Sequence, residues 1–115
     1  MSKITFESFE LIMSYDLNKK RDPHIEISFC IDGDMDYQAS WMGKAIVDDG
    51  SKKQMYWYGL TPDCSQAYDF DSFEQFSNAK VFHGKSIKEV WQLVSIFSID
   101  GGQVQEVLPF YCEMA

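Results

Sequence analysis

The sequence contains no long hydrophobic run, and this absence excludes the simplest membrane architectures. Its apolar runs are a few residues long, so we expect neither a membrane-spanning helix nor the apolar core of a signal peptide. The phosphate-binding patterns G-x-G-x-x-G and G-x-x-x-x-G-K-[ST] are also missing. Neither membrane insertion nor a glycine-rich phosphate loop is therefore predicted.

Cysteine is scarce, with three residues at Cys30, Cys64 and Cys112. Because the number is odd and no two are closely spaced, the sequence indicates neither a disulfide framework nor a C-x-x-C motif. Without a secretion signal the thiols are expected to be reduced, which predicts a cytoplasmic protein.

Basic side chains are also in short supply. Ten Lys and Arg residues face eighteen Asp and Glu residues, which gives a net charge of −8 and a pI near 4.5. Binding to nucleic acid or to an anionic membrane needs a positive field, so neither is expected. An acidic protein is better suited to a basic protein partner.

What the sequence does contain is typical of one globular domain. The chain has 115 residues, of which 45% are hydrophobic and 24% charged. A chain of this length buries about two thirds of its extended surface when it folds. We therefore predict a single domain over residues 1–115 with a core that needs no disulfides or metal.

Several segments alternate like β-strands. His24–Ile31 has Ile25, Ile27, Phe29 and Ile31 on one face. Ile4–Tyr15 fits either period, and we favour a strand because aromatic residues lead and no helix cap is evident. A further strand is expected within Met35–Val47, joined through a turn at Asp48–Ser51 to Lys53–Leu60.

The pattern then becomes helical. Ser72 to Gln75 and Ser86 to Glu89 both read as capping boxes that open short helices, the second continuing to Val94. Gly101 and Gly102 indicate a last turn between strands Ser95–Ile99 and Gln103–Cys112. The predicted fold class is α+β: mainly antiparallel sheet, two short helices on one face and a C-terminal hairpin.

Motifs for chemistry are incomplete. Asp32-x-Asp34-x-Asp36 resembles the start of a calcium loop, but Tyr37 and Gly43 stand where glycine and glutamate are needed. Cys64 and His83 have no nucleophile motif around them. No ligand spacing supports a zinc site built from His24, His83 and a cysteine. We therefore predict no enzyme activity, no cofactor and no metal site.

The acidic residues are gathered in two stretches of the sequence. Negative charge beside aromatic rings suits a cationic protein surface, because carboxylates steer the encounter and aromatics anchor it. The other interpretation is that the acids serve solubility and that Asp71 and Glu74 favour a helix N-terminus. The candidate partner-binding residues are Asp32, Asp34, Asp36, Asp48, Asp49, Asp63, Tyr68, Asp69, Asp71 and Glu74.

The segment from Tyr68 to Trp91 begins YDFDSFEQF and continues NAKVFHGKSIKEVW. It resembles a pattern found in small bacterial proteins, and the chain in general style resembles the acidic single-domain immunity proteins that neutralise bacterial toxins. The resemblance implies a cytosolic inhibitor that occludes a basic toxin domain, often a nuclease. It assigns no functional residue.

A second hypothesis is a small-ligand-binding or enzymatic domain with an aromatic pocket between sheet and helices. Trp41, Tyr56, Tyr58 and Trp91 would line that pocket. Tryptophans are nevertheless more often core residues than anchors, and Trp91 lies on the apolar stripe of the predicted second helix. A mimic of nucleic acid, with carboxylates spaced like phosphates, is a third hypothesis.

Overall fold

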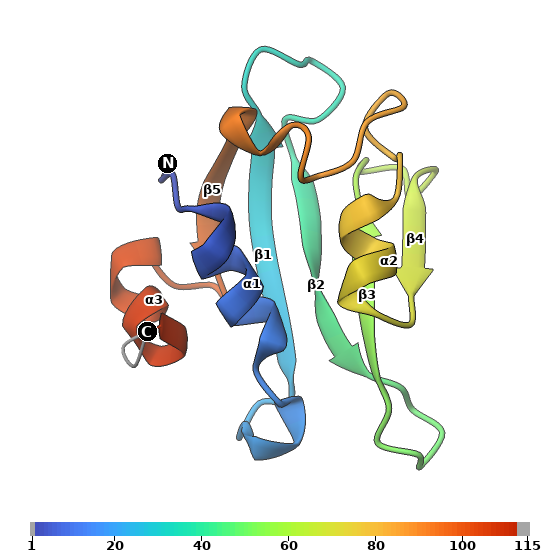
Figure 1. Ribbon diagram of the computed structural model, residues 1–115, viewed down its shortest axis with the longest axis vertical. Helices are drawn as coiled ribbons and strands as arrows, with labels where there is room; N and C mark the ends of the chain where they lie inside the picture. Colours follow the sequence, from blue (N-terminus) through green and yellow to red (C-terminus); the bar gives the residue numbers. More distant parts are fainter. Residues whose placement is uncertain (1, 113–115) are drawn as a thin grey trace.

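A computed structural model describes residues 2–112, and its centre is one antiparallel β-sheet (Figure 1). The strands are β1 (His24–Ile31), β2 (Ser40–Ile46), β3 (Gln54–Gly59), β4 (Ala67–Phe70) and β5 (Val94–Ile99). Their order across the sheet is β4-β3-β2-β1-β5. The first four strands form a meander, and β5 returns late in the chain to pair with β1.

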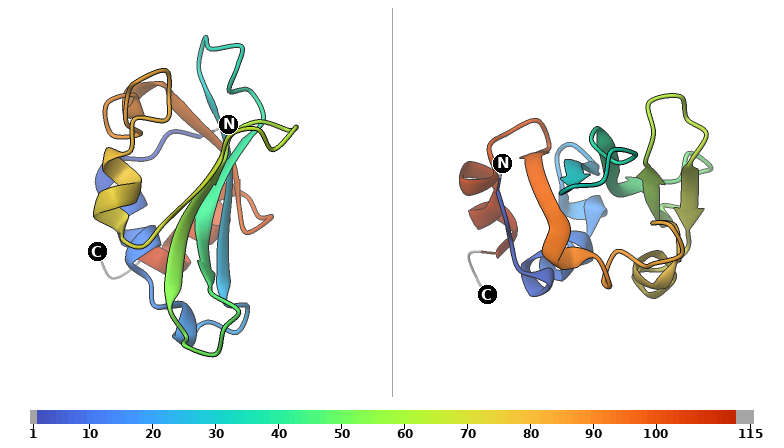
Figure 2. Two further views of the ribbon diagram at one scale, coloured as in Figure 1. Left: turned by 90° about the vertical axis from the view of Figure 1, so that its right-hand side faces the viewer. Right: turned by 90° about the horizontal axis from the view of Figure 1, so that it is seen from above.

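Within the described residues three α-helices accompany the sheet: α1 (Phe6–Ser14), α2 (Phe73–Asn78) and α3 (Val104–Cys112). Figure 2 shows α1 and α2 on the same face of the sheet, whereas no described helix covers the opposite face. Helix α3 packs against β5 and α1. The fold is therefore α+β, as predicted, and we call the uncovered side of the sheet the open face.

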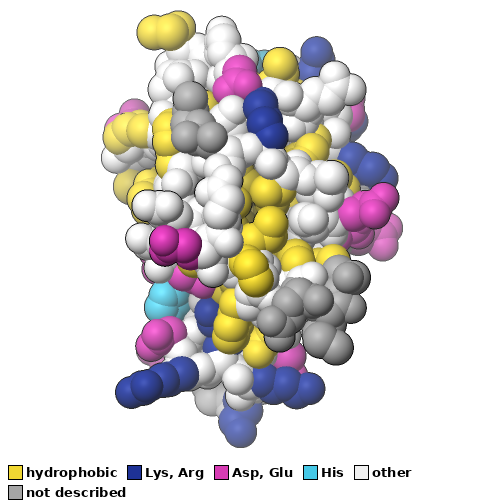
Figure 3. Space-filling view, turned by 90° about the vertical axis from the view of Figure 1, so that its left-hand side faces the viewer, with side chains coloured by type: hydrophobic (Ala, Val, Ile, Leu, Met, Phe, Trp, Pro, Cys, Tyr) yellow, Lys and Arg dark blue, Asp and Glu magenta, His cyan; other side chains and the backbone are white. Residues whose placement is uncertain are grey.

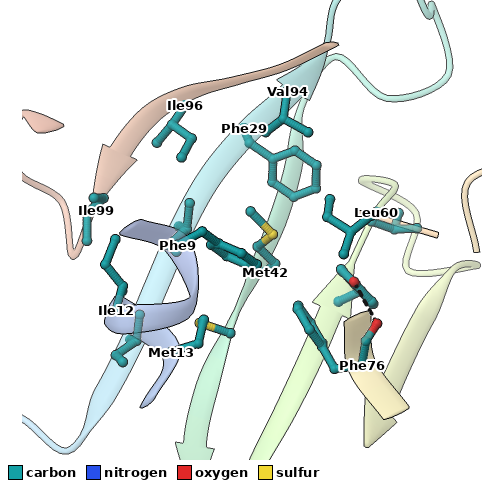
Figure 4. Close-up of a cluster of buried hydrophobic side chains, with 14 of the residues drawn as sticks. Phe9, Ile12, Met13, Phe29, Met42, Leu60, Phe76, Val94, Ile96 and Ile99 are labelled. Carbon is teal, nitrogen blue, oxygen red and sulfur yellow. Dashed lines mark hydrogen bonds between the residues drawn. The ribbon is translucent and has the colours of Figure 1, made fainter. Parts of the chain in front are cut away.

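The core lies between the sheet and α1 and α2. The predicted alternation of β1 is confirmed, because Ile25, Ile27 and Phe29 are fully buried on the covered side. Figure 4 shows side chains of α1 and α2 directed toward the strands. Tyr58 stacks on Phe76 at a centroid distance of 4.0 Å, and its hydroxyl donates to the Phe76 carbonyl at 2.9 Å. This space is filled by aromatic and aliphatic groups.

The prediction of a strand over Ile4–Tyr15 is wrong, because Thr5 is a helix cap. Its hydroxyl oxygen accepts the Ser8 N–H at 3.0 Å, so α1 begins at the next residue. Phe9, Ile12 and Met13 then bury one helical face completely. Spacing of three and four residues, rather than alternation, was the correct period.

The predicted C-terminal hairpin is also wrong, since Gln103–Cys112 contains α3 instead of a strand. Val104 and Tyr111 are buried on one side of this helix, with Val107 and Leu108 partly buried between them. This spacing is helical, although Pro109 inside the helix removes one hydrogen bond from its ladder.

The capping box at Ser86 forms, but the helix predicted after it does not. Ser86 and Glu89 exchange backbone N–H and side-chain hydrogen bonds, both at 3.2 Å. The chain then makes only turns and a 3₁₀ helix at Trp91–Leu93. It stops there because Val94 pairs with Ile31 in the sheet, so tertiary pairing prevails over the local signal.

Most of the other predicted strands and helices are confirmed. Strands β2 and β3 form the predicted hairpin, although the first strand begins only at Ser40, after a looped segment. Ser72 caps α2 by accepting the Gln75 N–H at 3.1 Å. Strand β5 lies where a strand was expected, whereas β4 was not predicted at all.

Candidate functional site

The open face has two cross-strand rows of side chains that follow from the strand register. The first row contains Glu26, Gly43, Trp57 and Asp69. The second row contains Ser28, Trp41, Gly59 and Ala67. Because alternate residues of a strand point to opposite sides, the neighbours of these residues face the core instead.

Each tryptophan of the open face stands opposite a glycine. Trp41 pairs with Gly59, and Trp57 pairs with Gly43 on the neighbouring strand. A Cβ atom on Gly43 would lie only 2.8 Å from Cζ2 of Trp57, so the indole ring lies against bare backbone. Aromatic rings commonly cover strand glycines in this way, and the result is a flat aromatic surface.

A shallow groove crosses this surface, and we call it the open-face groove. Its volume is about 570 Å³, and it extends from the strands to the loop that joins β3 to β4. Trp41 is 42% exposed, so much of its ring is available for contact. The lining residues are Glu26, Ala39, Trp41, Trp57, Gly59, Thr61, Pro62 and Cys64.

Negative charge surrounds the open-face groove. Glu26 lies in its lining, and Asp69 is exposed beside Trp57 in the same cross-strand row. Asp63 belongs to the bordering loop, where the Ser65 N–H and the hydroxyls of Thr61 and Ser65 hold the pKa of its carboxyl at about 2. Among the described residues that line the groove there is no Lys or Arg. The groove is thus aromatic and anionic.

The ten predicted partner-binding residues do not form one surface. Asp48 and Asp49 lie beyond the last residue of β2, whereas Asp32, Asp34 and Asp36 precede its first residue, at the opposite end of the sheet (Figure 1). Of the ten, Asp63 and Asp69 lie next to the open-face groove.

Several of these carboxylates have structural partners. Asp32 accepts from Lys3 at 2.6 Å and from Ser95 at 2.7 Å, and these bonds lower its pKa. Asp71 pairs with Lys53 at 2.9 Å. Their charge is therefore partly neutralised within the fold.

The other acids of that set lie away from the groove. Asp34 and Asp36 contact His83, and Asp49 accepts the Ser51 N–H in the β2–β3 turn. Glu74 lies in the first turn of α2, over the covered face. Tyr68 is 37% exposed on β4 and pairs with the buried Tyr58, so its register places it on the covered side.

The residues proposed for an aromatic pocket are dispersed. Trp41 is on the open face, and Tyr58 is buried in the core. Trp91 packs against Phe6 and Phe9 at centroid distances of 5.3 and 4.6 Å, as expected for a core residue. Tyr56 lines a separate groove, of about 510 Å³, with Glu7, Glu10, Leu11, Ser14 and Phe73.

The side of the molecule formed by α3 and β5 carries a further apolar area, which Figure 3 shows as a band of hydrophobic side chains. Phe97 and Phe110 are 46% and 56% exposed. The small cavity of about 250 Å³ on Phe110 contains Lys20 and Arg21 in its lining. Asp22 and Asp100 also line this cavity, so its charges balance and it lacks the purely negative lining of the open-face groove.

The Cys64–His83 pair is not assembled as a catalytic pair. Cys64 lines the open-face groove, whereas His83 lines a different cleft near Asp34. Cys30 is buried, and its pKa is raised by burial and by the nearby Asp32 carboxylate.

The sequence analysis did not include Trp41, Trp57 and Glu26 among the partner-binding residues, and it assigned Trp41 only to the alternative aromatic pocket or to the core. Trp41 was interpreted as core, and its exposure corrects that interpretation. A signal was present, because Trp41-Met42-Gly43 and Trp57-Tyr58-Gly59 repeat one W-x-G pattern on both strands of a hairpin.

Comparison with known proteins finds no matching family model, curated protein or solved structure. In the part of the chain that the structure describes, no helix combines the length and the apolar character needed to cross a membrane.

Proposed function

We propose that this protein is a non-enzymatic, cytoplasmic binding protein of the immunity type, which binds a basic protein partner through the open-face groove. The observation that supports this most strongly is the pairing of Trp41 and Trp57 with Glu26, Asp63 and Asp69 around a groove whose described lining contains no basic side chain.

The chemistry of the groove favours Lys and Arg side chains. A guanidinium or ammonium group is attracted to the face of an indole ring and to a nearby carboxylate. Carboxylates around the groove accelerate the encounter, while Trp41 and Trp57 supply the desolvated contacts that hold the complex. A nuclease domain uses Lys and Arg to bind phosphate, so covering them blocks its substrate.

The test begins with the product of the reading frame immediately upstream of the gene. We expect a basic, toxin-like protein that binds this chain one to one in isothermal titration calorimetry. The association rate should fall markedly as the salt concentration rises from low to physiological values. A metabolic enzyme without affinity for this chain contradicts the immunity proposal.

Two double variants with the same charge change locate the contact. Glu26→Gln with Asp69→Asn should slow association, and Trp41→Ser should weaken affinity by at least about tenfold, or 1.4 kcal/mol. Asp48→Asn with Glu74→Gln is the matched control, because both acids lie away from the groove. Equal slowing by the two double variants means that net charge, and not this groove, directs binding.

A small-ligand-binding domain is the alternative function, favoured by the groove between α1, α2 and β3 that Tyr56 and Phe73 line. Leu11→Trp should abolish binding of a ligand in that groove, whereas Trp41→Ser should leave it unchanged. Binding that is lost in Trp41→Ser and kept in Leu11→Trp supports the binding-protein proposal.

A further inference from the structure

Three potential metal ligands meet at one end of the sheet, outside the open-face groove. Asp34 and Asp36 belong to the loop between β1 and β2, and His83 belongs to the segment after α2. His83 Nε2 lies 3.3 Å from Asp34 Oδ2 and 3.1 Å from Asp36 Oδ2. One imidazole nitrogen therefore lies between two carboxylate oxygens from a distant part of the sequence.

These separations are those of ligands that share one ion. Zinc bonds to imidazole nitrogen and carboxylate oxygen are about 2.0–2.2 Å long, so two ligand atoms on a tetrahedral ion are roughly 3.3 Å apart. The candidate ligand atoms of the three residues all lie within 4.8 Å of one another. An ion could be bound with only small movements of the side chains.

The two segments are held together by contacts that need no ion. Tyr37, which is 1% exposed, donates its hydroxyl to the Val81 carbonyl at 3.2 Å. Its ring packs against the rings of Phe82 and His83, at 5.4 and 4.9 Å between centroids. The loop that carries both aspartates is therefore fixed against the segment that carries the histidine.

Asp34 is further oriented by its own loop. Its Oδ1 atom accepts the Asp36 N–H at 3.0 Å, which leaves Oδ2 directed toward His83. Within the described residues, neither Asp34 nor Asp36 has an ion pair with Lys or Arg. Lys85 supplies the positive charge in the lining of the adjoining cleft.

That cleft gives the ligands access to solvent. It has a volume of about 370 Å³, and both Asp34 and His83 line it. Asp36 and the His83 side chain are exposed, at 64% and 55%. An ion could enter from solvent, and water could complete its coordination.

We propose that Asp34, Asp36 and His83 form a binding site for one divalent transition-metal ion of the zinc class. The imidazole nitrogen selects this class over calcium and magnesium, which prefer ligands that are all oxygen. The site departs from the sequence prediction of no metal, since the pattern of alternating aspartates lacked its nitrogen ligand until the fold placed His83 beside it. It does not depend on the proposed function.

The test is calorimetric titration of chelator-treated full-length protein with zinc chloride. All variants carry Cys64→Ser, because that exposed thiol could itself bind zinc. One ion per chain is expected, together with a rise in Tm. His83→Gln and Asp36→Asn should each weaken zinc binding by at least about tenfold.

The chain offers a matched control in its other histidine. His24 lies 3.8 Å from a single carboxylate, that of Glu26, so His24→Gln should leave zinc affinity unchanged. Unchanged affinity in both His83→Gln and Asp36→Asn overturns the proposal. Calcium binding as tight as that of zinc and indifferent to His83→Gln also overturns it, because it would reveal only an acidic cluster. Asp36 lies on an exposed loop, so the Asp36→Asn variant still tests the proposal if His83→Gln does not fold.

Discussion

Gly43 shows how much of the open face depends on a single residue. A Cβ atom at this position would lie 1.9 Å from the Ile25 carbonyl oxygen and 2.8 Å from the ring of Trp57. The first contact is with backbone and cannot be relieved by a rotamer change. Glycine is therefore required here by lack of space.

We predict that Gly43→Ala lowers the free energy of unfolding by about 2–3 kcal/mol, the usual effect of overpacking a tight site. Urea denaturation should show a lower midpoint with an unchanged slope. Gly59→Ala is the control, because its Cβ would meet Trp57 only at an ordinary 3.8 Å and should cost less than about 1 kcal/mol. Equal losses of stability at the two glycines would contradict the conclusion that lack of space requires glycine at position 43.

Which side chains occupy the open face could not be predicted without the register of the hairpin. Trp41 with Gly59, and Gly43 with Trp57, are equidistant from Gly50 in the turn. The observed register is thus centred on Gly50, and it sets the two W-x-G patterns opposite one another. Nothing else in the sequence indicates where the hairpin is centred, so the pairing of each tryptophan with a glycine could not be foreseen and Trp41 was interpreted as a core residue.

Among the elements, α1 has an unusual C-terminal anchor. Lys44 is 4% exposed on the covered side of β2, and its ammonium donates to the carbonyls of Met13 and Tyr15, each at 2.8 Å. Burial lowers its pKa, but the negative end of the helix and the Tyr56 ring at 5.1 Å favour the cation.

We predict that Lys44→Ala lowers the free energy of unfolding by about 2–4 kcal/mol, because it removes two charged hydrogen bonds and buried packing. Lys44→Met keeps the apolar stem and should lose roughly half as much. Chemical denaturation gives both values. If the methionine variant matched the wild type, the hydrogen bonds to α1 would not contribute to stability.

Glu89, in the segment after α2, should make the stability of the fold depend on pH in the acid range. The Lys80 ammonium and the Ser86 N–H hold the pKa of Glu89 at about 2, below its ordinary value of 4.5. A depressed carboxyl pKa stabilises the folded state at pH values above the ordinary one. This contribution is lost as the pH falls from about 4.5 toward 2.

Urea denaturation at several pH values measures this dependence. Wild-type stability should fall across that acid range, and Glu89→Gln should be less stable at neutral pH but lose less on acidification. A parallel decline in both proteins would assign the acid sensitivity to other groups, such as Asp63, whose pKa is also held at about 2.

How well each element was predicted follows from where its signal lies. β1 and the β2–β3 hairpin carry alternation and turn residues within a few positions, and α2 carries its own cap, so local reading sufficed. In the segment of α1 the residues fit both periods, and the Thr5 cap that decides for a helix went unrecognised. The segment of α3 contains Pro109, and packing of the helix against β5 and α1, which a local pattern does not record, favours it over a strand.

For the molecule as a whole, the net charge of −8 does not say where the negative charge lies. Asp32, Asp71 and Glu89 are neutralised in part by Lys3, Lys53 and Lys80. Acidic residues that belong to one stretch of the sequence, such as Asp34 and Asp48, are separated in space by the length of the sheet. A charge count therefore predicted a cationic partner but could not place the surface that would bind it.

The most direct test of the proposed surface uses the three tryptophan indole N–H signals in a ¹H–¹⁵N correlation spectrum. Trp91 donates its indole N–H to the Ile4 carbonyl at 2.8 Å and does not line the open-face groove, so its signal is an internal control. On titration with a hexa-arginine peptide at low salt, we predict that the signals of Trp41 and Trp57 shift, that the Trp91 signal does not, and that added salt reverses the shifts. Unmoved Trp41 and Trp57 signals, or shifts confined to α1 and α2, would contradict the open-face groove as the binding surface.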